Sequence, residues 1–474
     1  MTSLQRTIAQ SGSRNTGGEL YDFAASLFPV CRSITGNGLR ETLRAIGARI
    51  PLQIHEVPSG TPVFDWVVPK EWNIRDAYIA DEQGRRLVDF RDSNLQVVNY
   101  SIPIHARMSY AELKPHLHTI PEHPEWIPYR TSYYKEDWGF CLTHEDSEKL
   151  DAHEQYDVYI DSSLEDGALT YGECYLPGQT ESEVLISSHC CHPSLANDNL
   201  SAMSVATFLA DELSKHDLRY SYRFVFAPGT IGAITWLARN REAAQRIRHG
   251  LVLSGIGNAD RFHYKKSRRG NGEIDCAAAH VLRHLPQAGN CVEFSPYGYD
   301  ERQYCSPGFN LPVGCLMRSV WGTFPEYHTS ADNLDFIHAA QLAEAWRVCL
   351  SIFDVLENNC TYRNLNPYCE PQLGRRDLYG SMDGNHSITE EINARLWVLN
   401  FSDGSHSLLD IAERSGIAFS VIQEAAYLLL RKQLLVAVCD AGCRYRPDVS
   451  EAALAFNTTL TSCECFTSNE SCHK

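Results

Sequence analysis

The chain has 474 residues and a formal net charge of −17, with 43% hydrophobic and 21% charged residues. This length predicts two or three domains, and the composition is that of a globular protein with enough apolar residues for a core. The acidic balance disfavours nucleic acid as a partner of the whole chain. Every apolar run falls short of the roughly 20 residues that a membrane span needs, so we expect no membrane association.

The N-terminal segment lacks the apolar core of a secretory signal, which favours a cytoplasmic protein. In that compartment the 17 cysteines of the whole chain are expected to be mostly reduced. Because they form no CxxC pair, they predict neither a disulfide framework nor a zinc ribbon. Residues 1–18 are polar and contain Gly and Ser, so we expect a flexible N-terminus. From Glu19 onward the spacing of the apolar residues is helical.

Two patterns follow along the chain. Residues 52–130 alternate apolar and polar positions between Pro, Gly and Asn-Asp clusters, which predicts a small inserted β-rich module. From residue 181 continuous apolar strands alternate with amphipathic helices, beginning with EVLISSH (183–189) and LSAMSVATFLADELSKH (200–216). This alternation predicts an α/β core with a mostly parallel, doubly wound sheet, formed by residues 19–51 and 131–355. Ligands of such sheets bind beyond the carboxyl ends of the strands.

Residues 375–450 read as helix, turn, helix, turn, helix, which predicts a winged-helix domain. The basic residues of this domain are balanced by acidic ones, so we expect protein interaction or dimerisation rather than DNA binding. The basic residues are Arg395, Arg414, Arg431 and Lys432. A homodimer is compatible with the sequence. The polar tail, residues 456–474, is predicted to be flexible, and the weaker interpretation is a metal site at Cys463, Cys465, Cys472 and His473.

The segment SSHCCHPSLANDNLS, residues 187–201, lies where the first apolar strand ends and the next helix begins. His189, His192 and Asp198 supply imidazole and carboxylate, the usual ligands of catalytic zinc, which takes three protein ligands and keeps one position open. Each has a structural alternative, with His189 as a hydrogen-bonded core residue and Asp198 as the cap of the following helix. The two cysteines between the histidines are soft ligands or simply core residues.

The segment FPEYHTSADNLDFI, residues 324–337, follows another apolar strand of the same predicted sheet. It brings Glu326, His328 and Asp332 within seven residues. Asp332 either orients His328 or starts the helix at Asn333. A second cluster of histidine and acidic residues therefore lies after a strand of the same predicted sheet.

The order strand, His, loop, Asp-Asn, helix and late YHTSAD resembles the zinc-aminopeptidase superfamily with the phosphorylase-like α/β core. More narrowly, CRSITGNG, ISSHCCHPSLANDNLS, APGTIGAITWL, KKSRRG, DERQYCSPGFNLP and PEYHTSADNLDF resemble a bacterial aminopeptidase-like family over residues 19–440. That family carries an inserted β module and a C-terminal winged helix, and is often attributed to polysaccharide or natural-product biosynthesis. The resemblance implies metal ligands at His189, Asp198 and His328.

The sequence departs from the superfamily at three positions. The paired glutamates expected after the second strand are replaced by Pro228-Gly229-Thr230. The aspartate expected at the end of the third strand is replaced by Ser254 or Gly255, and the one two residues after the first histidine by Cys191. We therefore expect one metal ion rather than two, zinc first, with iron or another divalent ion as alternatives, and His192 filling a vacant ligand position.

Hydrolysis also needs a general base and groups that stabilise developing charge. Glu326 and Glu301 are the candidate bases, each with an ion-pair role as its alternative. Tyr327 and Arg302 are candidates for stabilising an oxyanion. The basic stretch RFHYKKSRRGN, with Lys265, Arg268 and Arg269, is either a solvated surface or a site for an anionic group of the substrate.

These features predict a metal-dependent hydrolase that cleaves an amide bond of a small peptide or aminoacyl conjugate carrying an anionic group. The alternative is a metal-poor relative that acts as a binding or protein-interaction scaffold, which the missing glutamates favour. A DNA-binding regulator is a third hypothesis, and the charge balance of the C-terminal helices counts against it.

Overall fold

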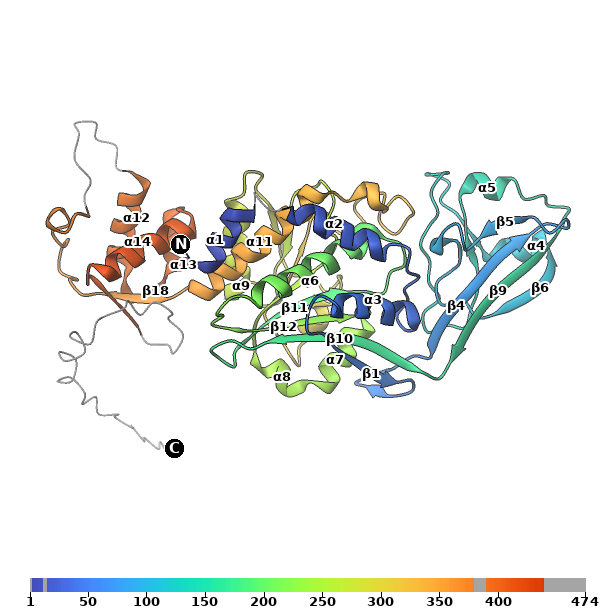
Figure 1. Cartoon of the computed structure of the whole chain (residues 1–474), viewed down its shortest axis with the longest axis horizontal. Coiled ribbons are helices and arrows are strands. Elements are labelled where there is room, and N and C mark those ends of the chain that lie inside the picture. Colours follow the sequence, from blue (N-terminus) through green and yellow to red (C-terminus); the bar gives the residue numbers. More distant parts are fainter. Residues whose placement is uncertain (1, 12–14, 379–388, 439–474) are drawn as a thin grey trace, which may run out of the picture. The chain divides into compact units, whose positions relative to one another are not determined.

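The computed structural model describes residues 2–11, 15–378 and 389–438. Contacts within the chain divide it into two units, Met1–Asn359 and Cys360–Lys474, which are described separately (Figure 1). No helix in the described ranges is long and apolar enough to cross a membrane.

The first unit is built on an eight-stranded sheet with the order β1-β10-β12-β11-β13-β16-β14-β15. Its centre is parallel and consists of β12 (Ser221–Ala227), β11 (Glu183–His189), β13 (Ile247–Leu253) and β16 (Val313–Met317). Antiparallel pairings flank this centre and involve β1 (Gln53–Pro58), β10 (Ala168–Leu176) and β14 (His263–Lys265), and β15 (Asn290–Val292) pairs with β14 in parallel at the edge. Nearly every residue of the four central strands is buried, which explains their continuous apolar pattern in the sequence.

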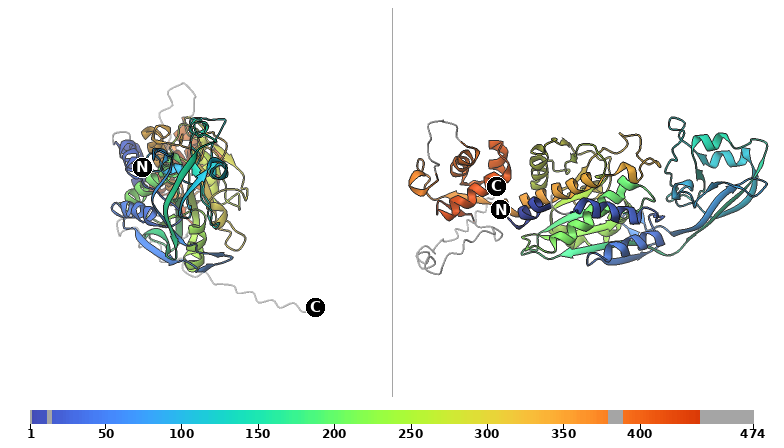
Figure 2. Two further views of the ribbon diagram at one scale, coloured as in Figure 1. Left: turned by 90° about the vertical axis from the view of Figure 1, so that its right-hand side faces the viewer. Right: turned by 45° about the horizontal axis from the view of Figure 1, so that its top comes forward.

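Helices cover both faces of this sheet (Figures 1 and 2). One layer contains α2 (Thr16–Leu27), α6 (Ala202–Leu213), α9 (Glu273–Arg283) and α11 (Ala339–Asn358), which contact one another. The other contains α7 (Ile231–Arg239) and α8 (Arg241–Arg246), and α10 (Glu301–Tyr304) packs against α7. The predicted doubly wound α/β core is confirmed, and α3 (Asn37–Gly47) packs beside β10.

The N-terminus differs from the flexible segment predicted for residues 1–18. Residues Ser3–Gln10 form α1, which packs on α11 with Leu4 buried. Thr2 and Gln5 form a reciprocal capping box, and their side chains both hydrogen-bond the Asp354 carboxylate, at 2.7 and 2.9 Å. The Thr-x-x-Gln spacing was the sequence signal for this helix start.

The inserted module contains a four-stranded antiparallel sheet, β5-β4-β9-β6. Strand pairing places its limits differently from the predicted 52–130, because β1 belongs to the core sheet and β9 belongs to the module. The strands are β4 (Glu71–Ala80), β5 (Arg86–Asp89), β6 (Ile104–Ser109) and β9 (Gln155–Glu165). Smaller elements complete the region, namely the β2–β3 hairpin (Pro62–Val63, Trp66–Val67), the β7–β8 pair (Leu117–His118, Phe140–Cys141), α4 (Tyr110–Leu113) and α5 (His144–Glu148).

The second unit is a winged helix, as predicted. Its helices are α12 (Glu390–Phe401), α13 (Leu408–Ser415) and α14 (Phe419–Arg431), and its sheet is β18 (Asp403–Ser407), β17 (Thr361–Asn364) and β19 (Leu435–Ala437). The unit begins at residue 360 rather than 375, because β17 is the central strand of this sheet. The predicted end of the domain at 450 and the tail at 456–474 lie outside the described residues.

A buried ion-pair cluster at the start of β11 offers a stability test of the core. Glu183 is fully buried and accepts hydrogen bonds from Arg223 at 2.6 and 3.0 Å and from Arg246 at 2.7 Å. Glu183→Ala removes a buried carboxylate that three hydrogen bonds hold and leaves the buried Arg223 with Glu173 as its remaining partner, so it is expected to lower the free energy of unfolding by about 3 kcal/mol. In the matched control, Glu293→Ala, an exposed pair with Lys266 is removed at a cost below about 1 kcal/mol. Urea denaturation measures both, and equal losses would contradict this interpretation of Glu183.

Candidate metal centre

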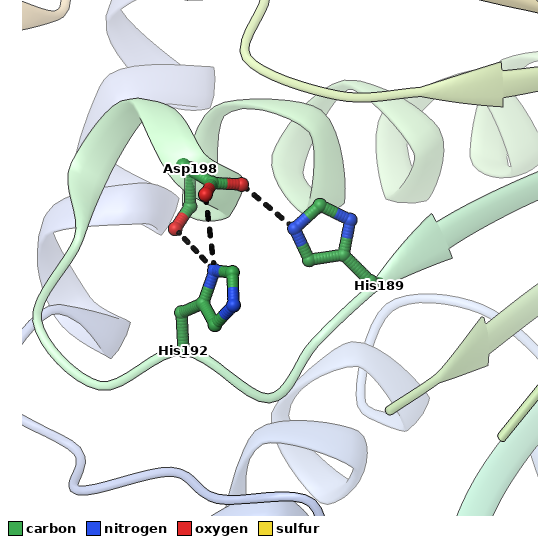
Figure 3. A group of neighbouring side chains, drawn as sticks. All are labelled: His189, His192 and Asp198. Carbon is green, nitrogen blue, oxygen red and sulfur yellow. Dashed lines mark hydrogen bonds and ion pairs between the residues drawn. The ribbon is translucent and has the colours of Figure 1, made fainter. Parts of the chain in front are cut away.

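The segment that follows β11 folds back over the strand end. β11 ends at His189, and the loop 190–195 and the irregular turn η4 (Ala196–Ser201) lead into α6. This path brings His192 and Asp198 beside His189 (Figure 3). The three residues are at most 5% exposed, and one ligand atom from each lies within 4.8 Å of the others.

Asp198 is the centre of this group. Its Oδ1 lies 2.7 Å from His189 Nε2, and its Oδ2 lies 3.2 Å from His192 Nδ1. His328, on the loop after β16, places its Nε2 3.1 Å from the same Oδ2. The structure therefore brings together all four predicted metal ligands around one carboxylate.

The protonation states suit a metal ion. Burial lowers the pKa of His189 to about 4 and also lowers the pKa of His328, so these imidazoles are neutral near pH 7. Burial alone would raise the pKa of Asp198, but the facing His192 and His189 hold it well below its ordinary value. Neutral imidazoles and an ionised carboxylate are the forms that bind metal, and they are zinc ligand types. The donor set therefore fits a divalent ion.

Asp332 supports the site through the backbone. Its carboxylate accepts the N–H groups of Asn197 at 2.5 Å and Asp198 at 2.9 Å. Burial raises the pKa of Asp332 to about 7. It neither orients His328 nor caps the next turn, the two roles considered from the sequence, because the η4 backbone uses both of its oxygens and Asn333 caps that turn.

Aromatic rings surround the three imidazoles. Tyr299 stacks on His189 with ring centres 3.8 Å apart, and its hydroxyl lies 3.1 Å from His192 Nε2. Tyr129 contacts His192 and His328 edge to face, at 5.2 and 5.1 Å. The sequence analysis missed Tyr299 and Tyr129, because their contacts join distant segments and follow no local spacing.

Tyr299 also explains the missing glutamates. A Cβ atom on Gly229 would lie 2.2 Å from Cε1 of Tyr299, so the ring occupies the space that any larger residue at position 229 would need. The Pro228-Gly229-Thr230 segment and the tyrosine therefore form one packed arrangement in place of an acidic pair.

Glu301 and Lys265 form a buried ion pair at 2.8 Å, and both are at most 3% exposed. Glu301 also accepts the backbone N–H of Tyr299, and Lys265 donates to the carbonyl of Tyr297 at 2.6 Å. Glu301 therefore has an ion-pair role, the alternative that the sequence left open, and its partner Lys265 is enclosed rather than part of a solvated surface. Both residues support the Tyr299 loop instead.

The three arginines predicted to bind substrate lie in two parts of the first unit. Arg268 and Arg269 are exposed and hydrogen-bond the side chain and the carbonyl of Asn310, at 3.0 and 2.9 Å. Arg302 is half-buried on α10, and its buried Nε has no hydrogen-bond partner among the described residues.

Glu326 and Tyr327 immediately precede His328. Tyr327 stacks on His328 with ring centres 4.0 Å apart, and Glu326 is half-buried in the same turn. The His328 side chain is 32% exposed, whereas the other three ligand candidates are almost fully enclosed. Access to the group is therefore from the side of this turn.

Comparisons with known proteins agree with this architecture. The family described as a domain of unknown function (DUF4910) matches residues 21–359, and a winged helix-turn-helix family matches residues 360–437. A Clostridium acetobutylicum protein, named for polysaccharide biosynthesis and an aminopeptidase-like domain, is 52% identical over 426 residues, which cover 90% of this chain and 98% of the relative.

Two solved structures extend the comparison. One, described as a peptidase from Clostridium acetobutylicum, has a TM-score of 0.87 and 50% identity, and the match covers 92% of this chain and 99% of that one. A zinc aminopeptidase from Bacillus subtilis has a TM-score of 0.51 and 11% identity, covering 71% of this chain and 94% of that one. The second likeness shows the fold alone, and the predicted aminopeptidase-like fold is confirmed.

The close packing of Gly229 on Tyr299 predicts a steric effect. Gly229→Ala places a methyl group inside the tyrosine ring volume, so the free energy of unfolding should fall by about 2 kcal/mol. Gly308→Ala is the matched control, since its Cβ would have no neighbour within 4 Å, and it should change stability by less than about 0.5 kcal/mol. Urea denaturation compares the two, and a harmless Gly229→Ala would contradict the packing argument.

Proposed function

The chain belongs to the DUF4910 family, and we propose that its first unit is a metal-dependent hydrolase that cleaves an amide bond. One observation carries the proposal, namely the convergence of three imidazoles on the buried Asp198 carboxylate at the carboxyl end of the central strand β11. Such strand ends are where open α/β sheets bind their ligands.

The metal ion and the protein side chains would have different roles in the reaction. A bound divalent ion, zinc first, would polarise the amide carbonyl and acidify water. Glu326, beside His328 on the accessible turn, would take the proton from the attacking water and pass it to the leaving nitrogen. Burial raises the pKa of Tyr327, so its phenol stays protonated and would donate a hydrogen bond to the developing oxyanion.

The proposed substrate is a small peptide or an aminoacyl conjugate. The name of the Clostridium relative supports a conjugate that belongs to polysaccharide biosynthesis. Arg302 remains a candidate for binding an anionic group of the substrate, because its buried Nε has no hydrogen-bond partner in the described part of the chain. Arg268 and Arg269 remain weaker candidates, since Asn310 already engages them.

The competing function is a metal-poor binding scaffold. The absence of the paired glutamates and the neutralised Glu301 favour it. The metal content of the purified chain separates the two proposals.

Elemental analysis of the full chain should find about one divalent ion per chain after zinc loading. Asp198→Ala should lose that ion and all amide hydrolysis, because it removes the shared carboxylate. Wild-type protein that binds no zinc would favour the scaffold and end the hydrolase proposal.

Glu326→Gln separates proton transfer from metal binding. The variant should keep its zinc but lose at least about 100-fold in kcat, since the amide cannot accept the proton. Glu181→Gln is the matched control, because Glu181 is exposed and precedes β11 at the opposite end of the strand. Full activity of Glu326→Gln against aminoacyl amides would exclude Glu326 as the base.

A further inference from the structure

The segment CRSITGNG, residues 31–38, contacts the loop that carries His192. Arg32 is fully buried, and its Nε donates a hydrogen bond to the carbonyl of His192 at 2.8 Å. Its Nη1 donates to the carbonyl of Leu27 at 2.7 Å. Because one rigid guanidinium group binds both carbonyls, it fixes the backbone of His192 relative to the end of α2.

A second contact holds the same loop through Ser194. Its hydroxyl donates to the carbonyl of Phe28 at 2.8 Å and accepts a hydrogen bond from Asn94 Nδ2 at 2.7 Å. Asn94 begins η2 (Asn94–Gln96) of the inserted module, and its Nδ2 also lies 2.9 Å from the carbonyl of Pro29. The loop is therefore anchored both to the segment that follows α2 and to the module.

A different segment of the module, residues 127–132, holds the loop of His328. The backbone N–H of Tyr129 donates to the carbonyl of His328 at 2.8 Å. Ile127 donates its N–H to the hydroxyl of Ser330 at 2.9 Å, and its carbonyl accepts the N–H of Ser330 at 2.8 Å. The two histidines are thus supported by two separate sets of hydrogen bonds.

Asn99 joins these two sets. It is 2% exposed, its Nδ2 donates to the carbonyl of Arg32 at 2.9 Å, and its Oδ1 accepts the hydroxyl of Ser33 at 2.5 Å. The carbonyl of Arg32 can only accept, which fixes the orientation of the amide group. The backbone of Asn99 binds residues 127–132, since its N–H donates to the carbonyl of Arg130 at 2.9 Å and its carbonyl accepts the N–H of Ser132 at 3.0 Å.

We propose that Asn99, acting through Arg32, is a positioning residue that sets the place of His192 relative to His328. Its side chain binds the segment that holds His192, and its backbone binds the segment that holds His328. The inserted module is then a working part of the candidate metal centre, because it supplies this link. The effect on zinc rests on the proposed function, whereas the link itself exists in the metal-free chain.

Hydrogen exchange of the full-length, metal-free chain, measured by peptide mass spectrometry, tests the link directly. Asn99→Ala keeps the backbone bonds but loses both side-chain bonds, so residues 27–33 and 190–195 should exchange about tenfold faster. Residues 326–332 should be unchanged. Ser330→Ala should give the reverse pattern, with faster exchange at 326–332 alone. An Asn99→Ala variant whose exchange is unchanged, or is faster to the same extent throughout the first unit, overturns the assignment.

Zinc titration against a competing chelator measures the effect on the centre, at a temperature at which every variant is folded. Asn99→Ala should weaken zinc binding by about tenfold, as expected for a partner that is not itself a ligand. Ser33→Ala should weaken it by about threefold, because only the hydrogen bond to Asn99 Oδ1 is lost. This milder variant provides the test if Asn99→Ala fails to fold.

Asn364→Ala is the matched control in the second unit. Asn364 is also buried, its Nδ2 donates to the carbonyl of Leu399 at 2.8 Å, and its Oδ1 accepts the N–H of Asn366 at 2.8 Å. The control should lower the stability of the second unit and leave the zinc affinity unchanged. Equal losses of zinc affinity in Asn364→Ala and Asn99→Ala would refute a positioning role for Asn99.

The two readouts separate this proposal from the metal-dependent function. Wild-type protein that binds no zinc ends the metal-dependent function, and the exchange pattern of the metal-free chain then decides the role of Asn99. Zinc binding that is normal in wild type and equally tight in Asn99→Ala and Ser33→Ala contradicts the positioning role and leaves the metal-dependent function intact.

Discussion

The buried carboxylate of Asp198 is the constraint on which the rest of the site depends. An ionised carboxylate that is 2% exposed costs several kcal/mol unless the surrounding groups compensate it. Here the compensation comes from three imidazoles on two segments and from a backbone turn held by Asp332. The strand end, the irregular turn and the loop after β16 must therefore assemble together, which makes the site a product of the whole α/β core.

The position of the Tyr299 ring beside His192 depends on a series of contacts that begins at Lys265. Lys265 neutralises Glu301, Glu301 holds the backbone of Tyr299, and the Tyr299 hydroxyl reaches His192. Gly229 permits this arrangement because a side chain there would collide with the tyrosine ring. Gly229 and Tyr299 are thus parts of one packed arrangement at the end of β12.

The sequence predicted what local patterns encode. Continuous apolar strands and amphipathic helices identified the parallel core, and close spacing grouped His189, His192 and Asp198. His328 was linked to them by resemblance. Tyr299 was missed because its contact with His192 spans 107 residues. The burial of Lys265 was not predicted, because a charged residue in a basic stretch gives no local sign of burial. The start of the N-terminal helix could have been predicted from its capping-box residues. The limits of the inserted β module could not, because they depend on which strands pair, and the hydrophobic periodicity of the sequence does not reveal that.

The charge of the proposed site bears on how it would recognise substrate. A single ionised carboxylate among the candidate ligands would leave a divalent ion with one uncompensated positive charge, and an enclosed site would strengthen its attraction for anionic or polarisable oxygen atoms. A nearby basic loop is then unnecessary for drawing in an anionic group. The contacts of the basic stretch agree with this interpretation. Lys265 forms an ion pair with Glu301, and Asn310 accepts hydrogen bonds from both Arg268 and Arg269. Selectivity would then come from the aromatic residues around the histidines, which limit the shape of what reaches the open position beside His328.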